Sequence, residues 1–233
     1  MSGFVERLKK KWKQFWLKPV QVFCFHQVSD EFEPDTMKQS DWMQTDEFKQ
    51  RLLMLKKKNT FVTLEEAYRY IANDRCRLKR YAVLTSDDGW ASLKSILPWL
   101  EEQQIPVTLF LNPLYLDGQH FRECETERYL SENDVQSIIR ECPKVTIGMH
   151  GWEHVDASKQ SEDEFRKNVQ QSVGALKGYE TFVPFFAFPW GRRNRMNVQV
   201  LKEFNLVPVL MDGLVNYDDA TQIHRELLTI ETK

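Results

Sequence analysis

The chain has 233 residues, of which 42% are hydrophobic, and this is enough to build one sizeable domain with a full apolar core. Its formal net charge of −2 gives no reason to expect nucleic acid as a partner. The four cysteines are scattered without a C-x-x-C pair, so neither a zinc ribbon nor a disulfide framework is indicated. No signal-peptide core and no run of the ~18 apolar residues of a membrane span is visible, so we expect a cytoplasmic protein.

The first 18 residues are predicted to form a basic amphipathic helix, followed by a catalytic domain over residues 19–233. Between residues 4 and 16, apolar side chains that include Trp12 and Trp16 recur at three- and four-residue spacing, and basic side chains fill the other face. This pattern is typical of helices that lie in a membrane interface. A helix packed on the domain's own core has the same pattern. The sequence thus leaves open a peripheral contact of residues 4–16 with the inner face of the membrane.

Strand-like runs alternate with helical patterns along the rest of the chain. About seven full strands and one short one are expected, at residues 20–25, 61–62, 81–84, 107–111, 144–148, 185–188, 207–210 and 226–230. Helices are expected at residues 45–57, 63–71, 92–104, 131–140, 161–177 and 197–204. Residues 112–129 are polar and irregular, which indicates an insertion or a lid. The alternation predicts parallel β/α units in a barrel-like fold, with ligands bound at the carboxyl ends of the strands.

Two adjacent carboxylates, Asp87 and Asp88, follow the strand-like run that begins at Tyr81. Adjacent residues on a strand point to opposite faces, so one carboxylate can bind a metal while its neighbour stays available as a base. Asp-Asp-Gly alone is also ordinary turn chemistry. The doublet therefore gains meaning only from what lies near it.

Two of the chain's five histidines, His150 and His154, follow another apolar run and a glycine. Taken singly, each could be a surface or core histidine. Together with Asp88 they form a mixed oxygen and nitrogen ligand set that suits zinc or a similar divalent ion, with positions left for water and substrate. The sequence therefore predicts a metal-assisted hydrolase.

Three motifs carry a family resemblance: Thr-Ser-Asp-Asp-Gly at residues 85–89, His-Gly-Trp-Glu-His at 150–154 and Phe-Pro-Trp-Gly at 188–191. In order and approximate spacing they resemble the polysaccharide deacetylase family, which is the NodB-homology fold of carbohydrate esterase family 4. The resemblance covers most of the chain, from about Val20 to Ile230. It implies a distorted (β/α)7-type barrel and the metal-dependent hydrolysis of N-acetyl or O-acetyl groups on a saccharide or glycoconjugate.

The resemblance also implies roles for individual residues. Asp87 looks like the general base, and the divalent metal, with zinc as the first choice, would be bound by Asp88, His150 and His154. Pro189 and Trp190 match the motif that lines the substrate groove. Near the carboxylates, Trp90 is a further substrate contact, and a backbone N–H of Gly89 or Trp90 would hold the oxyanion.

Two positions are left open. The general acid is either His26, which ends the first strand as in relatives that deacetylate poly-N-acetylglucosamine, or His224, near the place of the family's late histidine. We prefer His26, although a core histidine bonded to a backbone carbonyl is its alternative reading. Ala187 stands where many members have an arginine that orients the base, so Arg225 or Arg192 is expected to take that task.

Two other functions fit the same residues. The first is a deformylase or related amide hydrolase that acts on a lipid-linked amino sugar. The second is a saccharide-binding protein that keeps the fold without catalysis, which the residues at positions 86 and 187 make credible because they depart from the family's usual motifs.

Overall fold

The computed structural model describes residues 18–31, 42–73, 79–120, 129–217 and 219–228. The predicted N-terminal helix at residues 4–16 lies outside this part of the chain, so its membrane contact stays a prediction, as does the cellular location. Within the described residues, no helix combines the length and the apolar character needed to cross a membrane.

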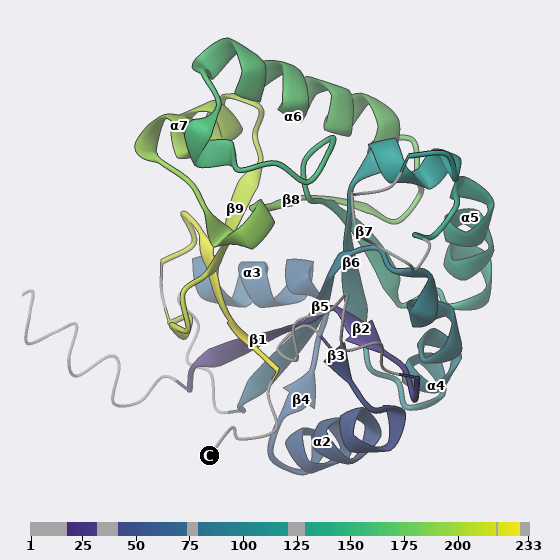
Figure 1. Ribbon diagram of the computed structural model, residues 1–233. Helices are drawn as coiled ribbons and strands as arrows, with labels where there is room; N and C mark the ends of the chain where they lie inside the picture. Colours follow the sequence, from purple (N-terminus) through teal and green to yellow (C-terminus); the bar gives the residue numbers. More distant parts are fainter. Residues whose placement is uncertain (1–17, 32–41, 74–78, 121–128, 218, 229–233) are drawn as a thin grey trace, which may run out of the picture.

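A ring of seven parallel strands forms the centre of the molecule (Figure 1). The ring closes because β1 pairs with β5 on one side and with β10 on the other. This confirms the predicted barrel. In ring order the strands are β1 (Val20–Phe25), β5 (Tyr81–Asp88), β6 (Val107–Leu111), β7 (Val145–Met149), β8 (Phe182–Ala187), β9 (Val207–Met211) and β10 (Ile223–Leu227).

Three short strands lie outside the ring. β4 (Thr60–Phe61) pairs with the first two residues of β5. β2 (Gln27–Val28) and β3 (Trp42–Met43) form a separate parallel pair just after β1. This pair holds the chain that leaves the carboxyl end of β1.

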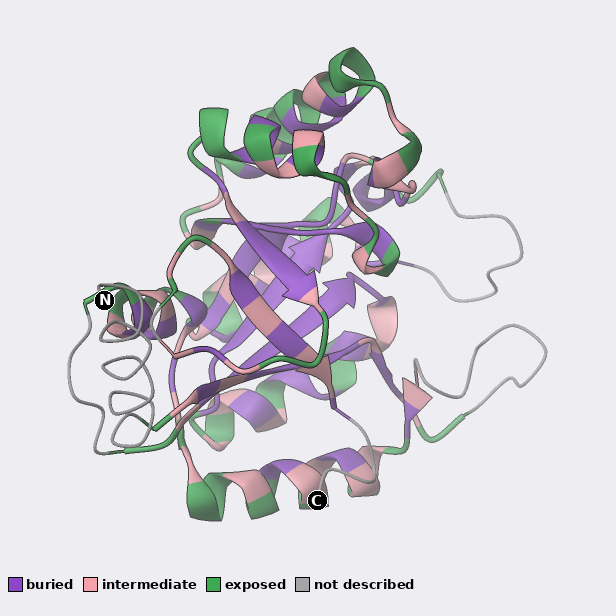
Figure 2. Cartoon of the chain, turned by 90° about the vertical axis from the view of Figure 1, so that its left-hand side faces the viewer, coloured by how far each residue is buried: buried purple, intermediate pink, exposed green. Residues whose placement is uncertain are grey.

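Helices surround the barrel (Figure 1), and Figure 2 shows that their outer faces are exposed while the strands are buried. They are α2 (Thr45–Lys58), α3 (Leu64–Ala72), α4 (Leu97–Glu102), α5 (Glu132–Glu141), α6 (Glu162–Leu176) and α7 (Arg195–Glu203). Capping boxes begin α3, α5, α6 and α7. The continuous helix predicted at 92–104 is wrong, because a 3₁₀ segment, Ala91–Ser95, precedes α4. Pro98 in the first turn of α4 has no N–H to donate to that segment.

The apolar residues form two clusters, one inside the barrel and one between the strands and the outer helices. The inner cluster includes Val22, Val83 and Phe185 together with the buried face of α3. Tyr70 of α3 also stacks on Tyr81, the first residue of β5, at a ring separation of 4.7 Å. Helix α3 therefore covers the amino-terminal end of the barrel.

Phe110 of β6 marks the boundary between the apolar and polar parts of the interior. It belongs to the inner cluster, and the Arg225 guanidinium lies 5.3 Å from its ring centroid. Gly148 on β7 leaves room for this ring, since a Cβ at that position would lie 2.6 Å from two of the ring carbons. From Phe110 toward the carboxyl ends of the strands, the barrel interior holds polar side chains.

The last strand begins and ends three residues earlier than the predicted 226–230. The apolar run after residue 226 favoured the later position, but the paired segment includes His224 and Arg225. A buried arginine breaks the expected apolar pattern because its guanidinium is neutralised inside the barrel. This shift moves Arg225 from a loop into the barrel wall.

Candidate metal centre and catalytic site

The structure brings Asp88, His150 and His154 together at the carboxyl ends of β5 and β7. The Nε2 atoms of His150 and His154 lie 3.4 and 3.3 Å from Asp88 Oδ1. All three side chains are buried, and their ligand atoms lie within 4.8 Å of one another. One carboxylate oxygen and two imidazole nitrogens at this spacing suit a zinc-like divalent ion. The predicted metal triad therefore has the geometry to hold a metal.

Neighbouring groups orient the two histidines. The His150 Nδ1–H donates to the Ala187 carbonyl at 2.9 Å, which leaves the Nε2 lone pair directed at the cluster. The Asn112 side chain donates to the His150 carbonyl at 2.6 Å, and the His154 N–H donates to the Tyr115 hydroxyl at 3.3 Å. Asn112 and Tyr115 were not predicted, although Asn112 directly follows β6 at the same end of the barrel.

Trp90 contacts the candidate metal-binding group (Asp88, His150 and His154, called the metal group below) through Asp88. Its Nε1–H donates to Asp88 Oδ2 at 3.1 Å, and its ring stacks on Tyr129 at 4.8 Å. Only 6% of the residue is exposed. Trp90 thus orients Asp88, and its expected role as a substrate contact stays a prediction.

The backbone turns sharply after Asp87, because Asp88 and Gly89 have φ values of 73° and 78°. This left-handed region is costly for an aspartate and separates the directions of the two carboxylates. A Cβ at Gly89 would lie 2.6 Å from Leu111 Cδ2, and the positive φ would strain any other residue there. The Gly89 N–H donates to the Asp87 carbonyl at 2.9 Å, and the expected oxyanion contact of the Gly89 or Trp90 N–H stays a prediction.

Asp87 points into the barrel and forms a bidentate pair with Arg225. The guanidinium donates to Asp87 Oδ1 at 2.7 Å and to Oδ2 at 2.5 Å. It also donates to Thr85 Oγ1 at 3.2 Å and to Cys24 Sγ at 3.3 Å. Of the two arginines that the sequence left open, the structure selects Arg225, since Arg192 pairs with Asp156 on the surface.

This pair fixes the charge of Asp87. Burial by itself raises the pKa of the Asp87 carboxyl, but Arg225, with His150 and His26, lowers that pKa below its ordinary value. Burial likewise works to lower the pKa of Arg225, and the Asp87 carboxylate raises it instead. Asp87 is therefore held as a carboxylate, which is the form that can accept a proton.

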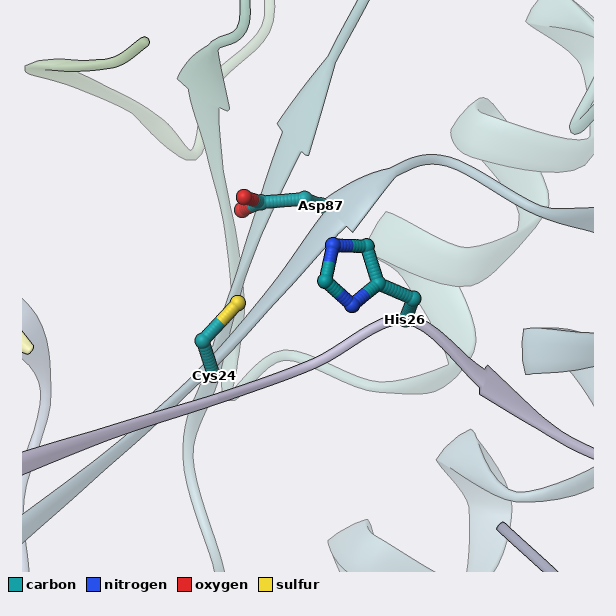
Figure 3. A group of neighbouring side chains, drawn as sticks. All are labelled: Cys24, His26 and Asp87. Carbon is teal, nitrogen blue, oxygen red and sulfur yellow. The ribbon is translucent and has the colours of Figure 1, made fainter. Parts of the chain in front are cut away.

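His26 and Cys24 lie on the other side of Asp87, and Figure 3 shows both side chains facing its carboxylate. Their ligand atoms and that of Asp87 lie within 4.8 Å of one another. Burial raises the pKa of the Cys24 thiol well above its ordinary value, and Arg225 already neutralises Asp87. This group consequently suits proton transfer better than it suits a second cation.

His26 is half-buried at the end of β1. Its Nδ1 atom has no hydrogen-bond partner among the described residues, so the reading of a core histidine bonded to a carbonyl is not what the structure shows there. The Ser86 hydroxyl donates to the His26 carbonyl at 3.3 Å and so ties β1 to β5 at this point. The ring is thereby placed beside the carboxylate.

Comparison with known protein families identifies the family of this chain. A sequence model described as polysaccharide deacetylase matches residues 74–209, more than half of the chain. The chain belongs to the polysaccharide deacetylase family. Members of this family are hydrolases that act on carbon–nitrogen bonds other than peptide bonds. No curated protein matches the chain.

Solved deacetylase structures share the fold. The structure of IcaB from Ammonifex degensii has a TM-score of 0.78 at 23% identity over 91% of this chain and 92% of that chain. The Streptococcus pyogenes deacetylase PplD has a TM-score of 0.75 at 17% identity, with 90% and 92% covered. A de-N-acetylase from Aggregatibacter actinomycetemcomitans has a TM-score of 0.72 at 14% identity, with 93% and 97% covered.

His224, the other candidate acid in this deacetylase family member, lies away from the cluster. Adjacent residues on a strand face opposite sides, so His224 points out of the barrel when Arg225 points in. Its Nδ1 lies 2.8 Å from Asp212 Oδ2, and its Nε2 lies 3.2 Å from the Gln222 side-chain nitrogen. The structure brings His26, and not His224, to the Asp87 carboxylate.

The groove motif of the deacetylase family lies at the edge of the metal group. Trp190 is 55% exposed, and its ring centroid lies 4.2 Å from that of His154 in an edge-on arrangement. Pro189 is buried beneath it. The Trp190 backbone has a φ of 52°, which turns the ring outward from the 3₁₀ segment Pro189–Gly191. An exposed aromatic face beside a ligand histidine is suited to stacking on a sugar.

Proposed function

We propose that this protein is a metal-dependent deacetylase that hydrolyses N-acetyl or O-acetyl groups on a saccharide or glycoconjugate. The observation that carries the proposal is the position of Asp87, which is paired with Arg225 next to the Asp88, His150 and His154 group. A carboxylate beside a metal-binding group, but not one of its ligands, is the arrangement that hydrolysis by activated water requires.

Asp88, His150 and His154 would hold the divalent ion, for which zinc is the first choice. When bound, such an ion supplies Lewis acidity that polarises a carbonyl and lowers the pKa of water. Asp87 accepts the proton of the attacking water, since its pKa is lowered and its carboxylate lies near the His150 ring. Arg225 keeps both carboxylate oxygens in place for that transfer.

The leaving amine has to be protonated, and an alkoxide leaving group gains from the same help. His26 is suited to donate this proton because histidine is the side chain that most often transfers protons in enzymes and its ring faces Asp87 (Figure 3). Trp190 is suited to hold the sugar by stacking at the rim. The saccharide would then lie between Trp190 and the barrel end.

The test is acetate release by purified protein loaded with one equivalent of zinc. N-acetylglucosamine oligomers and a nitrophenyl acetate ester are the two substrates, because nitrophenolate leaves without protonation. We expect His26→Gln to slow amide hydrolysis by about 10²-fold and ester hydrolysis far less. His224→Gln is the matched control and should behave like the wild type.

Several outcomes would change the assignment. If His224→Gln and not His26→Gln lost amide hydrolysis, the acid would be His224. Release of formate from a formylated amino sugar in place of acetate would assign the amide-hydrolase alternative. Binding of saccharide by metal-free protein, without release of any acyl group by the zinc-loaded form, would assign the non-catalytic alternative.

A further inference from the structure

A group of basic side chains follows the groove motif and enters α7. Arg192, Arg193 and Arg195 lie within four residues, and Lys202 lies two turns further along the helix. Arg192 is neutralised, because it donates to Asp156 at 3.1 Å, and its guanidinium lies 5.8 Å from the Trp190 ring. The other three cations form no ion pair within the described part of the chain.

Within the ranges that the structure describes, no carboxylate forms an ion pair with Arg193, Arg195 or Lys202. The acid closest to them on α7, Glu203, accepts hydrogen bonds from Arg166 at 2.6 Å and from Gln199 at 3.3 Å. Among the described residues, Arg193 donates to a carbonyl oxygen, that of Gly191, at 3.2 Å. In a chain with a net charge of −2, this leaves a local excess of positive charge.

The three cations share one hollow of about 590 Å³. The α7 residues that line it recur at three- and four-residue spacing, so they lie on a single face of the helix. No acidic residue lines the hollow; its walls are Arg193, Asn194, Arg195, Val198, Gln199 and Lys202.

One end of this hollow is tied to the motif that carries Trp190. The Trp190 ring contacts His154, and Gly191, the next residue, accepts the hydrogen bond from Arg193. The amino-terminal end of α7 follows the carboxyl end of β8, so it lies at the same end of the barrel as the metal group. Arg193 is thus fixed to the residue that follows Trp190.

We propose, on the basis of the function proposed above, that Arg193, Arg195 and Lys202 bind a phosphate group of the saccharide substrate. Guanidinium groups match the oxygens of a phosphate with two parallel hydrogen bonds, and two arginines with a lysine can carry its double charge. The substrate class is thus a sugar that carries a phosphate or pyrophosphate near the acetylated residue. A neutral glycan would leave these cations without a partner.

The direct test needs no catalysis. Binding of inorganic pyrophosphate is measured by calorimetry on the full chain after chelator treatment, so that no metal can bind the anion. We expect Arg193→Gln/Arg195→Gln to weaken binding at least about tenfold. Arg140→Gln is the control, since Arg140 is an exposed arginine on α5, on the other side of the barrel (Figure 1), and it should bind as the wild type does.

Equal binding by the double variant and the Arg140→Gln control would overturn the proposal, as would equally tight binding of a short DNA strand of the same charge. If the double variant does not fold, Lys202→Gln replaces it, with a smaller loss expected. An inactive protein that binds pyrophosphate through these residues would contradict the proposed catalysis and leave this site standing.

The choice of ligand distinguishes two possible sources of the phosphate group, a phosphodiester in a glycan and a pyrophosphate-linked sugar. Tighter binding of N-acetylglucosamine 1-phosphate than of inorganic phosphate, with no gain from pyrophosphate, indicates a phosphodiester in a glycan. Preference for a nucleoside diphosphate sugar over the sugar phosphate indicates a pyrophosphate-linked substrate. Both results require that the arginine substitutions remove the preference.

Discussion

The two ends of the barrel interior are built from different chemistry. At the amino-terminal end, α3 packs Leu64 and Ile71 against apolar residues of the strands. At the carboxyl end, the interior holds Thr85, Asp87 and Arg225 in one hydrogen-bonded group. Burial of an ion pair costs desolvation that its attraction offsets only in part, whereas apolar burial is favourable. The comparison indicates that the α3 end stabilises the fold, whereas the Asp87 end, where we propose catalysis, costs stability.

The largest expected effect on function is at the polar end. Asp87→Asn removes the proton acceptor and should reduce acetate release by about 10³-fold. The ligands Asp88, His150 and His154 are unchanged, so the variant should still bind one zinc ion. Metal content and acetate release are measured on the same sample. Normal turnover by this variant would show that Asp87 is not the base.

The substitution Arg225→Met tests how the buried Asp87–Arg225 ion pair affects the free energy of unfolding. It leaves the Asp87 carboxylate buried without its partner, so the free energy of unfolding should fall by about 3–5 kcal/mol in urea unfolding. Removing both charges in Asp87→Asn/Arg225→Met should recover part of this loss. If the double variant were as unstable as the sum of the single ones, the two charges would not interact as described.

The substitution Ile71→Ala at the apolar end is expected to reduce stability without reducing activity. This fully buried residue on α3 should cost about 2–4 kcal/mol of unfolding free energy, with acetate release per folded molecule unchanged. Met54→Ala on α2 is the control, since that side chain is 50% exposed and should change stability by less than ~0.5 kcal/mol. A loss of turnover by folded Ile71→Ala would mean that the two ends are not separate in function.

The smallest effect is expected at the start of α3. The Thr63 hydroxyl accepts from the Glu66 N–H at 3.1 Å, and the Glu66 carboxylate accepts from the Thr63 N–H at 3.0 Å. Thr63→Ala removes half of this capping box and should cost about 1 kcal/mol, seen as a lower midpoint of thermal unfolding. Thr63→Ser keeps the hydroxyl and should stay close to the wild type.

Much of the fold follows from the sequence because local pattern and barrel position agree. The β6 strand, Val107–Leu111, has the predicted bounds, and the capping boxes of α3 and α6 were visible as Ser or Thr three residues before Glu. The last strand was misplaced by three residues because Arg225 does not look like a buried residue when taken alone. Its burial depends on Asp87, which is 138 residues away.

The candidate site was likewise predictable in its motifs but not in its long-range side-chain contacts. The convergence of Asp88, His150 and His154 follows from motifs at the carboxyl ends of β5 and β7, two parallel strands of one barrel that are separated only by β6. Neither Trp90 as a donor to Asp88 nor Cys24 beside Arg225 could be read from the chain, since both contacts depend on side-chain directions across the barrel. Long-range partners of this kind leave no local sequence pattern.

The closing seam of the barrel has a consequence for biosynthesis. Asp87 belongs to β5 and Arg225 to β10, and the two strands flank β1. A growing polypeptide therefore contains the candidate metal-binding residues well before the Arg225 guanidinium that pairs with Asp87 has been translated. Until β10 has left the ribosome and docked, the Asp87 carboxylate has no guanidinium to fix its direction.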